Sequence, residues 1–306
     1  MVVLFMNRQR GNISIVLLVI GLFLVAVAQL AMVCVHRNVQ LMEDYWRGRQ
    51  LRMLCSSAME AFANKDLRAG ATAFEVQLFP GNHTTTVTSA VTLSADGLFR
   101  YLDVNTQASE QSYSLRNVQF QLSETDLQKA RQYMLISGKE ALGTEFLSGE
   151  VGYTSKEEVT IPQIDFLKNT STAKRSISSL GMEDVKLYGL DKRFYYLSDA
   201  SAPLTFTKNL KVYGTAVIAS EGSIIIEEGC QFFDRVIFLS KGNITIKEGV
   251  ELPKALLMAY GKVSLGAGCK LGGVIFSGGN IELLGSAQLV HDIEVVAPFM
   301  SAFYIL

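Results

Sequence analysis

The sequence predicts an α+β N-terminal module, a long helix followed by an antiparallel β meander, and then an all-β parallel solenoid of about four coils. An uncharged apolar segment predicts the helix, alternating apolar residues predict the meander, and a glycine-rich repeat predicts the solenoid. The chain divides accordingly into a basic leader (1–11), the long helix (12–66), the β meander (67–122), a helix with an irregular connector (123–193), the β-solenoid (194–292) and a C-terminal cap (293–306).

The long helix is predicted from an apolar segment that lacks any charge between Ile13 and Val35. A helix of that length spans about 34 Å, slightly more than the hydrocarbon core of a bilayer. The helical pattern continues beyond it, because no proline interrupts residues 37–64 and apolar side chains recur at helical spacing between Leu51 and Phe62. We expect one helix, apolar all round in its first half and amphipathic in its second.

Three interpretations of this N-terminal segment compete. It is a permanent membrane span, a secretory signal cleaved after the small residues Ala26-Val27-Ala28, or a prepilin-type leader cut between Gly11 and Asn12. Apolar residues continue past Ala28, where a mature N-terminus usually turns polar, and this argues against the secretory signal. The positive-inside rule does not decide the orientation, because arginines lie on both sides of the span.

The basic stretch from Arg8 to Gly11, the apolar helix that follows, the arginines after it and the small-residue segment SSAMEAF resemble the N-terminus of PilX-type minor pilins and GspK-type pseudopilins. The resemblance covers about residues 7–65 and implies processing between Gly11 and Asn12. Major pilins carry glutamate at the fifth mature position, which is Val16 here, so its absence indicates a minor subunit. Asn12 as the first mature residue departs from the family pattern.

The resemblance also implies a location and partners. The helix would anchor the chain in the inner membrane as a single pass surrounded by lipid, with the C-terminal domain outside the cytoplasm. Its partners would be other pilin subunits or the pilus assembly machinery, and the subunit would join a surface filament. The resulting hypothesis is a structural minor pilin or pseudopilin of a type IV pilus or related secretion filament.

The middle of the chain is predicted to form four strands followed by a short helix. Apolar residues alternate with polar ones between 72 and 122, and Pro80-Gly81-Asn82 and Asp96-Gly97 mark tight turns. Ser123 to Asp126 forms a capping-box-like start that predicts a helix through Met134. Residues 140–193 are predicted to be an irregular connector, with the segment 161–166 docked against a neighbour.

A repeat with a period of about 19 residues occupies the C-terminal third. Gly222, Gly242, Gly261 and Gly279 are spaced by 20, 19 and 18 residues. Columns of like residues accompany these glycines: Ile224/Ile244/Val263/Ile281, Ile226/Ile246/Leu265/Leu283, Phe232/Leu252/Leu271/Leu289, Ile218/Phe238/Leu257/Ile275 and Ser220/Ser240/Ala259/Ser277. This spacing predicts stacked coils, each with three short faces. The solenoid alone also resembles bactofilins.

The two ends of the solenoid are expected to differ. Residues 194–197 and 204–206 are predicted to form an incomplete leading coil. The apolar tail from Ile293 to Leu306 is expected to cover the last coil, and a partner-binding strand is the alternative for it.

Two cysteines fall in one inward column of the solenoid. Cys230 and Cys269 each follow a corner glycine, with Val250 between them on the intervening coil. Coils stack at about 4.8 Å, so two coils separate the Cα atoms by about 9.6 Å, beyond the reach of a disulfide. Both thiols are therefore expected to be free and buried.

The sequence predicts no enzyme, no cofactor and no metal site. The net charge of −1 and the lack of a basic stripe argue against nucleic acid, and three scattered histidines with no Cys-x-x-Cys pair argue against zinc. Outward charges at 227–228, 234–235 and 247–248 resemble those of polysaccharide-cleaving β-helices, but they form no repeated column and are interpreted as a solvated face. The alternative to the pilin hypothesis is a membrane-anchored extracytoplasmic solenoid that binds glycan or protein outside any filament.

Overall fold

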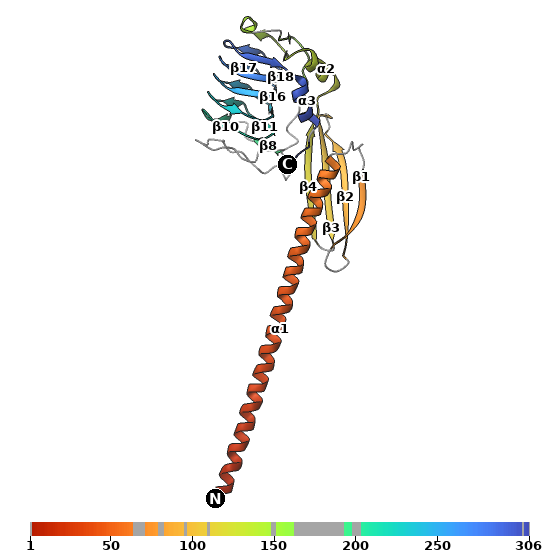
Figure 1. Ribbon diagram of the computed structural model, residues 1–306, viewed down its shortest axis with the longest axis vertical. Helices are drawn as coiled ribbons and strands as arrows, with labels where there is room; N and C mark the ends of the chain where they lie inside the picture. The colour runs from red at the N-terminus through yellow and green to blue at the C-terminus, as the bar shows by residue number, and fades with distance from the viewer. Residues whose placement is uncertain are drawn as a thin grey trace.

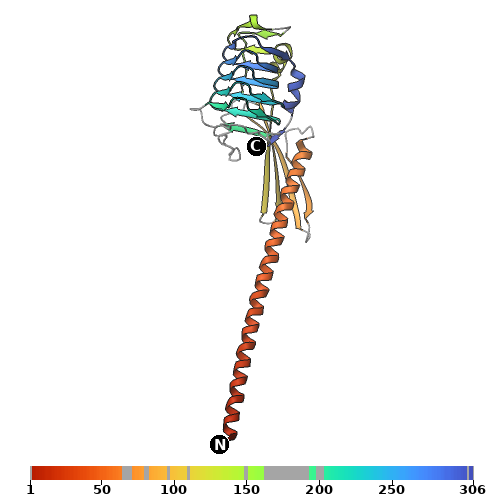
Figure 2. The ribbon, with the colours of Figure 1, turned by 60° about the vertical axis from the view of Figure 1, so that its left-hand side comes forward.

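The structure, a computed structural model, describes residues 2–63, 71–78, 83–94, 97–108, 111–147, 151–161, 193–197, 203–301 and 303–305. It consists of one long helix, a four-stranded antiparallel sheet packed on the end of that helix, and a parallel β-solenoid (Figure 1). The first part of the helix projects far from the rest of the molecule, as both views show (Figures 1 and 2).

Helix α1 extends from Val2 to Ala63 without interruption. Its 62 residues give a length of about 93 Å at 1.5 Å per residue. Only the last third packs on the sheet, where Leu51, Cys55, Ala58 and Phe62 are buried. These residues recur at helical spacing, so the expected packing of the end of the helix on its own domain is confirmed.

The meander consists of β1 (Ala71–Leu78), β2 (His83–Leu93), β3 (Phe99–Ala108) and β4 (Gln111–Phe120), paired antiparallel in that order. One face of the sheet covers α1, because Val87, Leu102 and Val104 form a buried cluster with Cys55. The predicted meander is confirmed. Gly97 has a φ of 71° in its turn, whereas Asp96 and the turn at 80–82 lie outside the described residues.

The coils of the solenoid stack in the register that the columns predicted. Ile218, Phe238, Leu257 and Ile275 are aligned neighbours. The strands that form these coils are β8 (Arg193–Leu197), β9 (Leu204–Phe206), β10 (Lys211–Val212), β11 (Ala216–Ser220), β12 (Ile224–Ile226), β13 (Gln231–Phe232), β14 (Val236–Ser240), β15 (Ile244–Ile246), β16 (Glu251–Ala259), β17 (Val263–Leu265), β18 (Lys270–Ser277), β19 (Ile281–Leu283) and β20 (Gln288–His291). The leading coil is present, because β8 pairs with β11 and β9 with β12.

The solenoid has about six turns, so the prediction of four coils is wrong. Part of the segment predicted as a connector adds to its far end: β5 (Leu135–Ser137) pairs parallel with β18, β6 (Ala141–Leu142) with β19, and β7 (Tyr153–Thr154) with β5. A 3₁₀ turn, η1 (Thr144–Phe146), follows β6. Residues that precede the solenoid in the chain thus cap its last coil.

A repeated hydroxyl contact explains why this upstream segment fits there. Ser137 Oγ donates to the carbonyl of Gly279 at 2.9 Å, and Ser277 Oγ donates to the carbonyl of Gly261 at 2.8 Å. Ser137 therefore extends the small-residue column by one coil. Before it, α2 (Glu124–Gln132) begins at the predicted cap, where Ser123 Oγ accepts from the amide of Asp126 at 3.1 Å.

The longest face of the solenoid is buried on both sides. Its outward side chains, Val217, Ile237, Leu256 and Val274 among them, belong to a second core shared with the meander. That core also contains Phe99, Tyr101, Val118 and Phe120 of β3 and β4, Ile161, and Val296 and Met300 of the last helix. The expected docking of residue 161 against a neighbour is an intramolecular contact, and residues 162–166 lie outside the described chain.

The tail does not end over the last coil, which corrects the expected cap. Helix α3 (Ile293–Ser301) runs along the side of the solenoid, where Val296 lies beside Gly273. The chain then forms β21 (Phe303–Ile305), antiparallel to β4 and aligned with the first residue of β8. The tail thus joins the meander to the first coil in one sheet of 15 strands (Figure 2).

Candidate functional site

Between Ile15 and Met42, α1 exposes its large apolar side chains on every side. Phe23 is 67% exposed and Met32 is 77% exposed. The most apolar 18-residue window has a mean hydropathy of 2.8 and is not buried against any other part of the described chain. The helix is long and apolar enough to cross a membrane, and it lacks the internal contacts of a core helix.

The predicted processing site lies inside this helix. Backbone of helical conformation continues through Gly11 and Asn12. Processing there stays a prediction, since helical backbone alone does not distinguish a cleaved leader from an intact anchor.

An apolar stripe continues past the end of the predicted span. Val35, Val39, Met42, Trp46 and Met53 follow one another at helical spacing, and each is between 47% and 62% exposed. At about 100° per residue this stripe lies on the side of α1 opposite the face that packs on the sheet. The structure therefore leaves it without a covering element in the described part of the chain.

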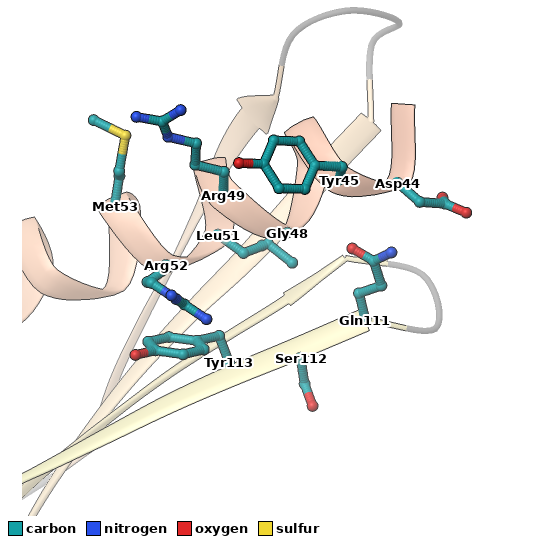
Figure 3. A pocket seen from close by; sticks show the side chains of 10 residues that line it. All are labelled: Asp44, Tyr45, Gly48, Arg49, Leu51, Arg52, Met53, Gln111, Ser112 and Tyr113. Atoms are coloured by element: carbon teal, nitrogen blue, oxygen red, sulfur yellow. The ribbon is translucent and has the colours of Figure 1, made fainter. Parts of the chain in front are cut away.

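A groove lies between α1 and the beginning of β4 (Figure 3). Its volume is about 930 Å³. Figure 3 shows Arg52 directed across the groove toward Tyr113, with its guanidinium carbon 5.2 Å from the ring centroid. Arg49 lies on the outer rim and stacks over Trp46 at 5.7 Å. The lining consists of Asp44, Tyr45, Gly48, Arg49, Leu51, Arg52, Met53, Gln111, Ser112 and Tyr113.

Two of the residues that line the groove, Arg49 and Arg52, carry positive charge. Asp44, which also lines the groove, pairs with Arg47 at 3.4 Å. Within the described ranges, neither Arg49 nor Arg52 has a carboxylate partner. The Oε1 atom of Gln111, at the other wall, is buried and has no hydrogen-bond partner among the described atoms.

Two of the outward carboxylates of the solenoid, Glu228 and Asp234, join neighbouring coils. Glu228 accepts from Lys208 at 2.7 Å, and this hydrogen bond lowers the pKa of its carboxyl. Asp234 accepts from the backbone amide of Gly214 at 2.7 Å. Both contacts cross one coil, so these charges have structural partners. In the part of the chain that the structure describes, no group of three His, Cys, Asp or Glu side chains could hold a metal ion.

An exposed aromatic stack lies on the third face of the solenoid. The rings of Tyr213 and Phe233 are parallel within 8°, with centroids 4.6 Å apart, and Phe233 is 46% exposed. This pair was not predicted from the sequence. The sequence does contain a signal for it. Tyr213 and Phe233 directly follow the inward residues Val212 and Phe232, which are aligned on successive coils.

The solenoid cysteines occupy the predicted column. The neighbouring residues Gln231, Glu251 and Lys270 are aligned, which places Val250 between Cys230 and Cys269. Both thiols are free and buried, and burial raises the pKa of each. The prediction of free, buried thiols is confirmed.

No protein family, curated protein or solved structure matches this chain.

Proposed function

We propose that the protein is a structural subunit of the minor pilin or pseudopilin type, anchored by α1 and carrying the solenoid as a head outside the cytoplasm. It takes part in the assembly or function of a type IV pilus or a related secretion filament. In this proposal α1 first lies in the inner membrane and then packs against the helices of other subunits.

The observation that carries the proposal is the extent of exposed apolar surface on α1. A bilayer core of about 30 Å covers about 20 helical residues, and the uncharged segment from Ile13 to Val35 already fills it. Trp46 lies 11 residues further, about 16 Å beyond the hydrocarbon. Val39, Met42 and Trp46 are nevertheless about half exposed or more. Lipid tails do not reach these residues, so other helices are the natural cover for them.

The arrangement of the domains agrees with this role. The helix packs its last third on an antiparallel sheet and leaves the remainder bare, which is the arrangement that the resemblance to pilins implies (Figure 1). The last coil of the solenoid ends in the two-residue strands β6 and β7. Edge strands this short disfavour strand pairing between copies at that end.

N-terminal sequencing of the protein extracted from membranes tests the proposal. A mature start at Asn12 is expected, and Gly11→Leu should leave the leader attached while Gly21→Leu should not. A start at Gln29 would identify an ordinary secreted protein and contradict the proposal. An intact Met1 would leave a plain membrane anchor.

The orientation has its own test. Protease added to intact spheroplasts should digest the chain beyond about residue 66. Digestion that occurs only after lysis would place the solenoid in the cytoplasm and reject the proposal.

The exposed stack of Tyr213 and Phe233 favours a second candidate function. Aromatic side chains at a protein surface are frequent anchors for ligands and partners. An anchored solenoid that binds glycan or protein outside any filament would use this surface. Loss of binding in a Tyr213→Ala/Phe233→Ala variant, together with an unprocessed N-terminus, would favour this function over the pilin type.

A further inference from the structure

The groove between α1 and β4 includes the free edge of a β-strand. Gln111, Ser112 and Tyr113 are consecutive, and all three line it. Successive side chains of a strand point to opposite faces of the sheet, so a hollow that contacts all three must contain the edge of the strand. The other edge of β4 is paired with β3, which leaves only the edge next to α1.

The upper part of this same edge is already occupied. β21 pairs with residues 117–119 of β4, and its last aligned residue, Ile305, lies opposite Asn117. Within the described chain, no strand pairs with residues 111–116 on that side. This edge of β4 is therefore paired at residues 117–119 and open at residues 111–116. The open part borders the groove.

The chemistry of the groove indicates what would fill it. An unpaired strand edge offers backbone donors and acceptors that match an extended peptide. Arg52 crosses the groove above Tyr113, and Arg49 lies on the rim. Neither arginine has a carboxylate partner in the described ranges. A guanidinium pairs with a carboxylate through two parallel hydrogen bonds, so acidic side chains fit this site.

We propose that the groove is a docking site for an extended acidic segment of a partner protein, which adds to β4 as a further strand below β21. Its backbone would pair with residues 111–116, and an Asp or Glu side chain facing α1 would pair with Arg52. This proposal does not depend on the filament role, because any partner with such a segment would fit.

Peptide binding to the full-length protein in nanodiscs tests the proposal. The probe is a fluorescein-labelled octapeptide of alternating threonine and glutamate, followed by fluorescence anisotropy. We expect Arg52→Glu to weaken binding by about tenfold or more, as expected for loss of one charge-assisted hydrogen-bonded pair. Arg131→Glu makes the same charge change on α2 outside the groove and should leave binding unchanged.

Two further measurements separate strand addition from general charge attraction. Arg52→Glu should gain affinity for the matching threonine–lysine peptide. Methylation of one alternate set of peptide amides should abolish binding to the original protein, while methylation of the other set should be tolerated. Equal affinity of Arg52→Glu and the original protein, equal binding of both methylated peptides, or binding of neither octapeptide would overturn the proposal.

Discussion

The solenoid and α1 are both rich in apolar residues, but they differ in what covers those residues. Phe238 in the solenoid is completely buried, whereas Phe23 in α1 is 67% exposed. The solenoid buries both its inward columns and the outer side of its longest face within the chain. Among the side chains of α1 that the structure describes, the buried ones lie in its last third. The apolar surface of the solenoid is thus covered within the molecule, whereas that of α1 between Ile15 and Met42 has no cover in the described part of the chain.

The largest expected difference between the two regions comes from removing a phenylalanine ring. Phe238 contacts the rings of Phe206 and Phe232, with centroids 5.7 Å and 5.6 Å away. We expect Phe238→Ala to lower the free energy of unfolding by about 3–5 kcal/mol, because it leaves a cavity in the core. Phe23→Ala should change the value by less than about 0.5 kcal/mol in detergent. Chemical denaturation measures both, and equal losses would contradict the comparison.

A glycine substitution in the solenoid should have the next largest effect. Gly273 has a φ of 132°, and a Cβ there would collide with the carbonyl oxygen of Ala255 and lie 3.1 Å from Val296 on α3. Gly273→Ala should therefore cost about 3 kcal/mol or more.

Gly249 is the matched control for this substitution. Its φ is 64°, and a Cβ there would meet nothing within 4 Å. Asn209 already adopts a φ of 59° at the equivalent corner of the leading coil. Gly249→Asn should cost less than about 1 kcal/mol, because asparagine tolerates this conformation. A thermal-shift series that ranked the two variants the other way would contradict the corner assignment.

The solenoid cysteines should behave as small core residues. Cys230 Sγ donates to the carbonyl of Thr207 at 2.9 Å and is otherwise surrounded by the core. Cys230→Val should cost less than about 1.5 kcal/mol, whereas Cys230→Asp should cost several times more by burying a charge. Mass spectrometry of the alkylated, unreduced protein should show both solenoid thiols modified after denaturation. A Cys230–Cys269 crosslinked peptide would contradict the register.

The smallest expected effect concerns an ion pair between coils. Glu282 accepts from Lys262 at 2.9 Å, and this hydrogen bond lowers the pKa of its carboxyl in the folded protein. Its stabilisation is therefore present above the unfolded pKa of about 4.3 and is lost as the pH falls below it. Glu282→Gln should cost less than about 1 kcal/mol at pH 7 and less than that at pH 3, because the stabilisation is lost as the pH falls through the lowered pKa of the folded protein. A double-mutant cycle with Lys262→Gln, measured at both pH values, checks the assignment.

The parts of the fold that were predicted correctly are those whose signal is local or periodic. The columns through Ile218 and Phe238 follow from a period that repeats along the chain, and the packing face of α1 follows from helical spacing. The capping coil at residues 134–154 was not predicted, because it precedes the repeat in sequence but follows it in space. A single Ser137-Gly138 pair, distant from the repeat, carries little periodic signal.

The burial of the outer face could have been predicted and was not. Strands such as Ala216–Ser220 and Val236–Ser240 are almost continuously apolar, a pattern typical of strands covered on both faces. What covers them could not be predicted, because α3, β4 and Ile161 come from three distant parts of the chain. The groove at Arg52 could not be predicted for the same reason, because it forms where α1 meets β4, two elements that are distant in sequence.

The depth of Met42 in a bilayer tests most directly whether α1 carries apolar surface that lipid does not cover. A spin label would be attached to Met42→Cys, and separately to Leu24→Cys, in a Cys34→Ala background reconstituted in nanodiscs. Met42 lies seven residues past Val35, about 10 Å beyond the hydrocarbon. We predict that the label at position 42 is accessible to a water-soluble nickel complex, while the label at position 24 is accessible only to oxygen. A position-42 label that is as protected from nickel as the position-24 label would show that lipid covers the stripe, and would contradict the need for partner helices.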